Sequence, residues 1–293
     1  MDERDGLAER FEGHREQLRT VAHRMLGSLS EAEDAVQETW LRLERVDADQ
    51  VENLGGWLRT VVTRICLDML RSRRSRREDL AEQQEFDQVP VTTRGSHPEE
   101  EALLADSVSR ALLVVLDTLE PGERIAFVLH DMFAVPFDQI APIVERTTDA
   151  TKKLASRARR KVRGTPVVPA AELARNRRVV TAFLTAARAG DLPGILDVLA
   201  PDVVRRADPA ALPPGVAAVV RGARAVAEGT AALARRSQFA EPALVDGAVG
   251  VVVAPRGRLL FVLTFAIEDD RITEYEVIAD PDRLRRLDLA VLS

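Results

Sequence analysis

Hydrophobic residues recur at helical spacing in the first part of the chain, with an apolar side chain returning every three or four positions. Gly27 is expected to end the first helix as a C′ glycine. Ser30, with Glu33 three residues later, predicts an N-cap and a capping box for the second helix. We therefore expect residues 1–78 to form a helical bundle. Its periodic segments are 7–26, 32–43 and 58–70.

A second group of helices is predicted after an irregular stretch. Residues 79–101 are rich in glutamine and acidic residues, contain two prolines and lack periodicity, so we expect a flexible linker there. Residues 102–165 predict two apolar helices followed by a helix-turn-helix motif. Thr147 or Thr148 would cap the last helix. The expected helices cover 103–119, 124–132, 137–144 and 148–163.

The pattern changes again in residues 170–293, where helices give way to strands. Residues 255–257 (Pro-Arg-Gly) predict a turn between two of these strands. Helices followed by a meander of long strands favour an α+β cone, in which a curved antiparallel sheet wraps around a helix. Helices are expected at 171–189, 192–199 and 221–235, and strands at 249–254, 259–267 and 271–278.

The composition indicates where in the cell the protein is expected and whether it is expected to bind a cofactor. No hydrophobic run approaches the ~20 residues that span a bilayer, and no apolar segment follows the charged N-terminus as in a signal peptide. The single cysteine, Cys66, falls on an apolar helical face and suits a reducing compartment. We therefore expect a cytoplasmic protein without membrane association. The chain also lacks phosphate-binding loops and Cys/His metal spacings, so no cofactor or metal is expected.

The formal net charge of −6 conceals two surfaces of opposite sign. The predicted helix over 32–43 leaves Leu41 exposed beside acidic and amide side chains, which indicates a docking surface. Five of the seven residues from Arg71 to Arg77 are arginine, which favours phosphate binding. The first half of the chain is therefore expected to face both DNA and a basic partner.

The segments Glu31–Leu43 and Gly56–Arg71 together resemble region 2 of the extracytoplasmic-function sigma factors. The resemblance implies that the acidic helix binds a coiled coil on a large subunit of RNA polymerase. The residues expected to face polymerase are Asp34, Gln37, Glu38 and Leu41.

The resemblance also implies that the following helix and loop melt and read the −10 promoter element. Trp57 fits two interpretations, because it would either stack on an unpaired base or fill the core. The residues expected at the −10 element are Asn53, Trp57, Arg59, Thr60, Thr63, Arg64, Asp68, Arg71, Arg73 and Arg74.

The apolar segments Ala111–Leu116 and Ile125–Asp131 resemble region 4 of the same family, which reads the −35 element. Two positions depart from the family pattern. Pro142 stands inside a helix where a charged residue is usual, and an interior proline removes one helical hydrogen bond. Glu145 stands at a turn position that is commonly glycine. The residues expected at the −35 element are Thr147, Thr148, Asp149, Thr151, Lys152, Lys153, Ser156, Arg157 and Arg160.

The closing segment Ala279–Leu284 is similar to the Asn-Pro-Asp-Lys-Leu ending of a sigma-factor subgroup that carries a SnoaL-like domain. Asp208–Pro214 replaces the Asp-Gly-Gly-Gly-Lys run of that subgroup. The resemblance implies that residues 170–293 regulate the sigma modules in cis, so no separate anti-sigma factor is expected.

Two other classes of function remain open. Cone folds include enzymes and modules that bind a small ligand, and candidate general bases exist at Asp197, Asp202 and Asp208. After Gly164, however, the chain has no histidine, cysteine or tryptophan and a single tyrosine, Tyr275. A plain helix-turn-helix repressor would not need the acidic docking face.

The leading hypothesis is a non-enzymatic alternative sigma factor whose partners are core RNA polymerase and promoter DNA. Its expected fold is multidomain. Two all-α sigma modules, a region 2 bundle (1–78) and a region 4 helix-turn-helix (102–165), precede an α+β SnoaL-like cone (170–293).

Overall fold

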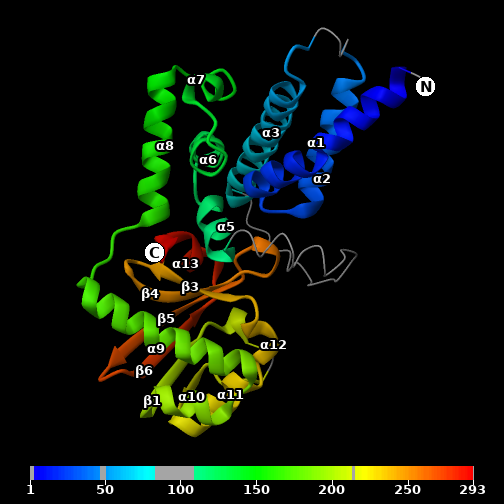
Figure 1. The fold of residues 1–293 in the computed structure, drawn as a ribbon. Coiled ribbons are helices and arrows are strands. Elements are labelled where there is room, and N and C mark those ends of the chain that lie inside the picture. Colours follow the sequence, from blue (N-terminus) through cyan, green and yellow to red (C-terminus); the bar gives the residue numbers. More distant parts are fainter. Residues whose placement is uncertain (1–2, 47–50, 83–108, 213–214, 293) are drawn as a thin grey trace. The chain divides into compact units, whose positions relative to one another are not determined.

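The computed structural model describes residues 3–46, 51–82, 109–212 and 215–292. They form two compact units, which we call the helical unit and the α+β unit (Figure 1). The helical unit contains the described parts of Met1–Val108 together with Leu119–Arg159, and the α+β unit contains those of Ser109–Thr118 together with Arg160–Ser293.

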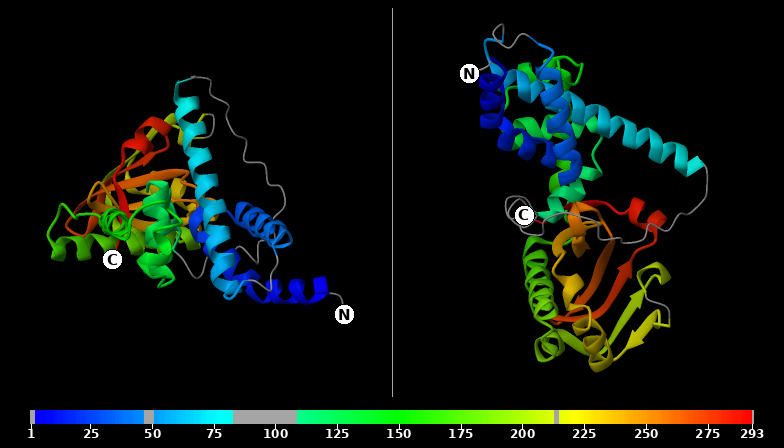
Figure 2. Two further views of the ribbon diagram at one scale, coloured as in Figure 1. Left: turned by 90° about the horizontal axis from the view of Figure 1, so that it is seen from above. Right: turned by 90° about the vertical axis from the view of Figure 1, so that its right-hand side faces the viewer.

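The helical unit begins with a bundle of α1 (Glu3–Leu26), α2 (Leu29–Leu43) and α3 (Leu54–Glu82). Gly27 ends α1 with a φ of +73°, and its N–H donates to the His23 carbonyl, so the predicted C′ glycine is confirmed. The C-terminal part of α3 projects beyond α1 and α2 (Figure 2). Each helix contributes fully buried side chains to the core, among them Met25, Val36, Leu43, Leu58, Val62 and Cys66.

Two boundaries differ from the sequence prediction. The helix α2 begins at Leu29, and its N-cap is Ser28, whose hydroxyl accepts from the Glu31 N–H (3.4 Å), so the predicted Ser30 cap is wrong. The helix α3 continues to Glu82, so residues 79–82 of the predicted linker are helical. The rest of that linker, 83–101, lies outside the described residues.

The remaining helices of this unit are α6 (Pro121–Phe127), the π-helix η2 (Val128–Met132), α7 (Phe137–Ile140) and α8 (Thr148–Arg163, to Arg159 in this unit). The predicted helix at 124–132 is therefore an α-helix that starts earlier and continues as a π-helix.

The helix α7 is shorter than predicted. It stops four residues before the expected end, and Pro142 lies just beyond it, where it has no N–H to continue the helix. Glu145 follows in the left-handed region, with a φ of +56°. Of the two predicted caps, Thr147 rather than Thr148 caps α8, because its hydroxyl accepts from the Ala150 N–H (3.2 Å).

The α+β unit is built on a seven-stranded sheet in the order β2-β1-β6-β5-β4-β3-β7. Neighbouring strands are antiparallel except β1 and β6, which are parallel, so the expectation of a wholly antiparallel sheet is wrong. The direction of strands distant in sequence depends on the path of the chain between them, which periodicity does not reveal. The strands are β1 (Leu199–Ala207), β2 (Val219–Arg221), β3 (Ala240–Val245), β4 (Ala248–Val253), β5 (Phe261–Glu268), β6 (Arg271–Ile278) and β7 (Leu289–Val291).

Helices complete the α+β unit, and α9 lies across the sheet (Figure 1). Phe183 of α9 forms the centre of the core, with its ring 5.8 Å from Phe265 and 5.6 Å from Tyr275. The Tyr275 hydroxyl is buried and lies 2.9 Å from the Thr230 hydroxyl. The helices and 3₁₀ turns of the unit are α5 (Arg110–Asp117), α9 (Ala170–Ala189), α10 (Leu192–Val198), η3 (Pro209–Ala211), α11 (Ala223–Ala231), α12 (Ala234–Ser237), η4 (Pro255–Gly257) and α13 (Pro281–Arg286). Among the described helices, none is both long enough and apolar enough to cross a membrane.

Candidate nucleic-acid interface

The outer face of α2 presents the residues that the sequence predicts to face polymerase. Asp34 and Gln37 are exposed, and Leu41 keeps 40% of its surface accessible. Glu38 is half-buried and accepts from the Arg42 guanidinium (3.0 Å) one turn later. An exposed leucine between carboxylate and amide groups is the chemistry of a binding surface rather than of a core.

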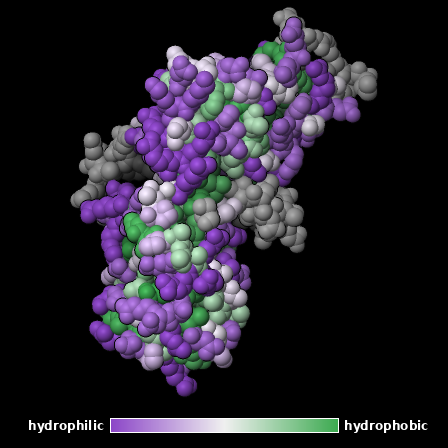
Figure 3. Space-filling model, turned by 60° about the vertical axis from the view of Figure 1, so that its left-hand side comes forward, coloured by the Kyte–Doolittle hydropathy of each residue, from purple (hydrophilic) through white to green (hydrophobic). Residues whose placement is uncertain are grey.

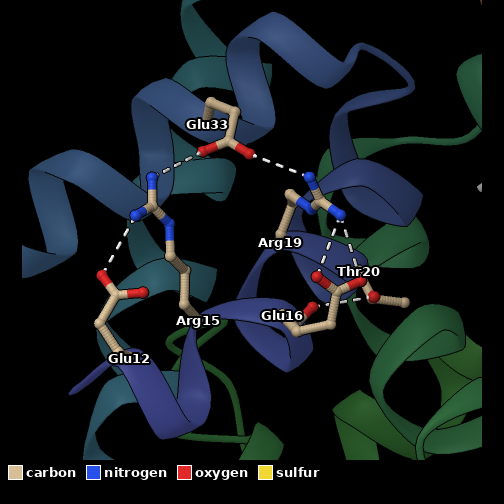
Figure 4. A network of polar contacts seen from close by, with 6 residues as sticks. All are labelled: Glu12, Arg15, Glu16, Arg19, Thr20 and Glu33. Carbon is tan, nitrogen blue, oxygen red and sulfur yellow. Dashed lines mark hydrogen bonds and ion pairs between the residues drawn. The ribbon is translucent and has the colours of Figure 1, made fainter. Parts of the chain in front are cut away.

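A network of polar contacts with α1 orients this helix (Figure 4). Glu33 of α2 accepts from both Arg15 and Arg19 of α1, each at 3.5 Å. Arg15 also contacts Glu12 (3.1 Å), and Arg19 contacts Glu16 (3.0 Å). These contacts fix α2 against α1, and Asp34, Gln37 and Leu41 are exposed because the apolar face of α2 is the one buried in the bundle.

The first turns of α3 contain both exposed and internal members of the predicted −10 set. Asn53 is exposed and caps α3, because its side-chain oxygen accepts from the Gly56 N–H (2.9 Å). Trp57, Arg59 and Thr60 are half-buried. Thr63 is fully buried, and its hydroxyl donates to the Arg59 carbonyl (2.7 Å), so it faces the bundle in this structure.

The arginines of α3 have distinct surroundings. Arg64 is exposed, as is Asp68. Arg73 instead connects the bundle, since it donates to the Glu31 carboxylate of α2 (3.1 Å) and to the Leu26 carbonyl that ends α1 (3.0 Å).

Two other arginines of α3 are paired with carboxylates from the second half of the helical unit. Arg71 lies 3.5 Å from Glu145, in the turn before α8, and 3.9 Å from Asp68. Arg74 forms an ion pair with Glu120, which precedes α6. The predicted −10 surface is therefore partly occupied by the protein's own acidic groups.

Basic residues lie along the solvent-exposed side of α8. Thr147 and Asp149 are exposed and Thr148 is half-buried, whereas Thr151 is fully buried and donates to the Thr147 carbonyl (2.9 Å). Arg157 reaches Glu123 of α6 (3.1 Å). Hydrophilic residues cover most of the upper part of the surface in Figure 3, the view that brings the α8 side forward. The other predicted −35 residues are exposed: Lys152, Lys153, Ser156 and Arg160.

The candidate general bases of the α+β unit do not form an acid–base site. Asp197 and Asp202 are exposed. Asp208 accepts from the N–H groups of Asp280 and Ala279 (both 3.0 Å) and from Arg283 (2.6 Å). Burial alone would raise the pKa of Asp208, but these hydrogen bonds outweigh burial and lower its pKa, which makes it a poor base.

The Asp208 contacts join two segments that lie far apart in the sequence. The aspartate stands where the related subgroup has its glycine-rich run, and its partners belong to the closing segment. Nothing in the spacing of two segments some 70 residues apart would have paired them. Within the described ranges, no group of histidine, cysteine, aspartate and glutamate could hold a metal ion.

Comparison with known proteins matches this arrangement of modules. Residues 10–76 match sigma-70 region 2, and residues 109–162 match sigma-70 region 4. The probable ECF RNA polymerase sigma factor SigI of Mycobacterium tuberculosis is 35% identical, with 97% of each chain covered.

The ECF RNA polymerase sigma factor SigJ of the same organism is 33% identical, over 93% of this chain and 91% of SigJ. The crystal structure of Mycobacterium tuberculosis SigJ is similar over 94% of this chain and 98% of that chain, with 31% identity and a TM-score of 0.46. Because SigI and SigJ are related to this chain over nearly its whole length, the chain belongs to the extracytoplasmic-function RNA polymerase sigma factors, with sigma-70 regions 2 and 4 followed by an α+β domain.

Proposed function

We propose that this sigma factor binds core RNA polymerase through the outer face of α2 and reads promoter DNA through α3 and α8. Sigma factors are transcription initiation factors rather than enzymes, and they direct polymerase to promoters. The assignment of these tasks to particular residues is our proposal.

The exposed face of α2 is the observation that carries the polymerase contact. Leu41 remains accessible on a helix whose opposite face is buried in the bundle, at Ala32 and Thr39 among others. Burial of this leucine on a partner would remove apolar surface from water, while Asp34 would favour a basic partner. A repressor that binds DNA alone gives no reason for such a face.

Promoter contact is assigned to the positive charges that remain accessible. Lys152, Lys153 and Arg160 extend along one side of a capped helix, the geometry of a helix that enters a major groove. Arg64 is an exposed arginine of the −10 set in α3, and the exposed Asn53 caps the start of this helix. The phosphate-directed arginines supply affinity that falls with salt, and contacts to base edges supply specificity.

We assign the α+β domain a regulatory role in cis, which would replace a separate anti-sigma factor. We expect the protein to work in the cytoplasm, where polymerase acts. The low pKa of Asp208 argues against general-base catalysis in this domain. A small apolar ligand in the cone is the alternative, which native mass spectrometry of the purified protein would reveal as a bound mass.

The decisive experiment is reconstituted run-off transcription with core RNA polymerase, combined with a binding measurement. We expect the full chain to support promoter-specific transcripts. The Asp34→Arg variant is expected to bind core polymerase at least roughly tenfold more weakly, about 1.4 kcal/mol. Glu9→Arg, the same charge change on the exposed face of α1, is the matched control and should bind as the unchanged chain does.

Equal affinity of Asp34→Arg and Glu9→Arg for core polymerase would contradict the assignment of the polymerase contact to α2. Promoter DNA binding by the full chain without any transcription, and without polymerase binding, would instead favour the repressor hypothesis.

A further inference from the structure

The first helix of region 4 packs on the α+β domain. The region 4 match begins at residue 109, and α5 covers Arg110–Asp117. This helix lies against β3, β7 and η4 and belongs to the α+β unit, whereas α6 to α8 belong mainly to the helical unit. Five of its six apolar side chains are buried: Ala111, Leu113, Val114, Val115 and Leu116.

A carboxylate from β3 performs the capping of α5. Ser109 occupies the N-cap position but makes no side-chain bond to the helix. One oxygen of Glu241 instead accepts from the Ala111 N–H (3.0 Å) and from the Ser109 hydroxyl (2.5 Å). The other lies 3.4 Å from the Arg110 guanidinium. A negative charge at this end of a helix satisfies an unbonded N–H and interacts favourably with the helix dipole.

The surface under α5 is held in place by long-range bonds. The strand β7 pairs with β3, where Ala243 faces Val291. At the turn before β4, the Asp246 side chain accepts from the Asp288 N–H (2.8 Å), just before β7 begins. The helix that leads into β7 is anchored by the Asp208–Arg283 contact.

The end of region 4 meets the same strand. Gly164 follows α8 with a φ of +59°, and a Cβ placed on it would lie 2.5 Å from the Cβ of Ala290 in β7. Glycine is therefore required both by the backbone conformation and by the close approach to β7. Strands of the α+β domain thus contact both α5, at the start of the region 4 segment, and Gly164, two residues after its end.

We propose that β3, β7 and η4 form a helix-binding surface whose partner is α5 of the same chain, with Glu241 as the cap, so that region 4 is complete only when the α+β domain holds its first helix. The α+β domain is then required for recognition of the −35 element and does not act only as an inhibitor of it. This functional consequence rests on the proposed role of region 4, whereas the binding of α5 does not.

Hydrogen–deuterium exchange of the full-length protein tests the binding directly. In Glu241→Ala we expect the amides of α5 to exchange roughly tenfold faster, the factor that corresponds to a lost N-cap. Glu274→Ala is the matched control, since Glu274 is also a strand carboxylate paired with an arginine, Arg206 at 2.8 Å, on β1. Equal α5 exchange in both variants and in the unchanged chain would overturn the proposal.

A cross-linking experiment keeps the test independent of how Glu241→Ala folds. With cysteines at Arg110→Cys and Phe239→Cys, which leave Glu241 in place and whose side chains lie together (Arg110 guanidinium 5.8 Å from the Phe239 ring centre), a short bis-maleimide should join the two sites within one chain. Cys66 does not interfere, because burial raises the pKa of its thiol to about 12. Absence of the intramolecular link in the folded double variant, or equal linkage in Arg110→Cys/Glu274→Cys, would contradict the proposal.

Transcription assays distinguish the binding of α5 to the α+β domain from the effect of that binding on promoter recognition. If the full chain supports transcription and Glu241→Ala loses activity on promoters that depend on the −35 element, both the binding and its consequence stand. If the full chain supports none, the sigma assignment fails, while exchange and cross-linking still decide whether α5 is held. Faster α5 exchange with unchanged transcription would overturn the requirement for the domain.

Discussion

At the scale of single residues, Glu145 shows how a departure from the family pattern is accommodated. Its φ of +56° lies in the region that glycine adopts freely, and a residue with a Cβ loses roughly 1–2 kcal/mol there. The turn is nevertheless formed, and the Arg146 N–H donates to the Ala141 carbonyl (3.0 Å). Glu145 also lies 3.5 Å from Arg71. Glycine at this position would keep the turn and remove both the strain and the ion pair.

We predict that Glu145→Gly raises the free energy of unfolding by about 1 kcal/mol relative to Glu145→Ala. Both changes remove the carboxylate, so their difference isolates the backbone conformation. Urea denaturation followed by circular dichroism measures it. Equal stability of the two variants would show that the turn adopts another conformation in solution.

At the scale of elements, α3 has two tasks that its sequence does not separate. In the sequence, its arginines form one basic cluster. In the structure, Arg73 donates to the Glu31 carboxylate and to the Leu26 carbonyl, whereas Arg64 is exposed. Arg73 thus connects all three helices of the bundle, and Arg64 is available to a phosphate. The same residue type therefore stabilises the fold at one position and is offered to DNA at another.

We predict opposite effects for two otherwise equal substitutions. Arg73→Ala should lower the free energy of unfolding by about 1.5–3 kcal/mol, because it removes charge-assisted hydrogen bonds within the bundle. Arg64→Ala should leave stability within about 0.5 kcal/mol and should weaken promoter binding, with the slope of log affinity against log salt reduced by about 1.

Chemical denaturation and salt-dependent fluorescence anisotropy of the polymerase holoenzyme on promoter DNA measure the two effects. Loss of stability in Arg64→Ala, or an unchanged salt slope, would contradict the division of tasks within α3.

At the scale of the molecule, the helical unit contains both predicted DNA-reading elements. The −10 and −35 elements lie roughly 25 base pairs apart, about 85 Å at 3.4 Å per base pair. Arg71 and Arg74 of α3 pair with Glu145 and Glu120, so region 2 and the α6–α8 part of region 4 occupy one compact unit. If α3 and α8 contact the two elements as proposed, we expect these ion pairs to separate in the promoter complex.

We predict that Glu120→Gln strengthens binding of the holoenzyme to promoter DNA at low salt, by up to roughly fivefold. Exposed ion pairs contribute about 0.2–1 kcal/mol, and promoter binding no longer has to break this one. Glu44→Gln, an exposed carboxylate just after α2, is the matched control for the change in net charge. Equal gains in both variants would indicate only a general electrostatic effect.

The sequence by itself determined what depends on neighbours along the chain. The apolar periodicity of α1 to α3, Gly27 after α1, the Thr147 cap and the strands β4 to β6 follow from local spacing and turn chemistry. The resemblance of regions 2 and 4 to the family is carried by such local segments as well. Boundaries were less exact, because Ser28 and Ser30 are chemically equivalent caps until the packing of α2 chooses between them.

Only the tertiary structure decided what depends on contacts between distant segments. The parallel pairing of β1 with β6, the Glu241 cap on α5, the Asp208–Arg283 contact and the burial of Thr63 join residues whose separation in sequence carries no periodic signal. A polar side chain becomes structural when burial removes it from water and a partner replaces that water. Burial of this kind depends on the whole fold. The same residue type can therefore belong to a binding site at one position and to the core at another.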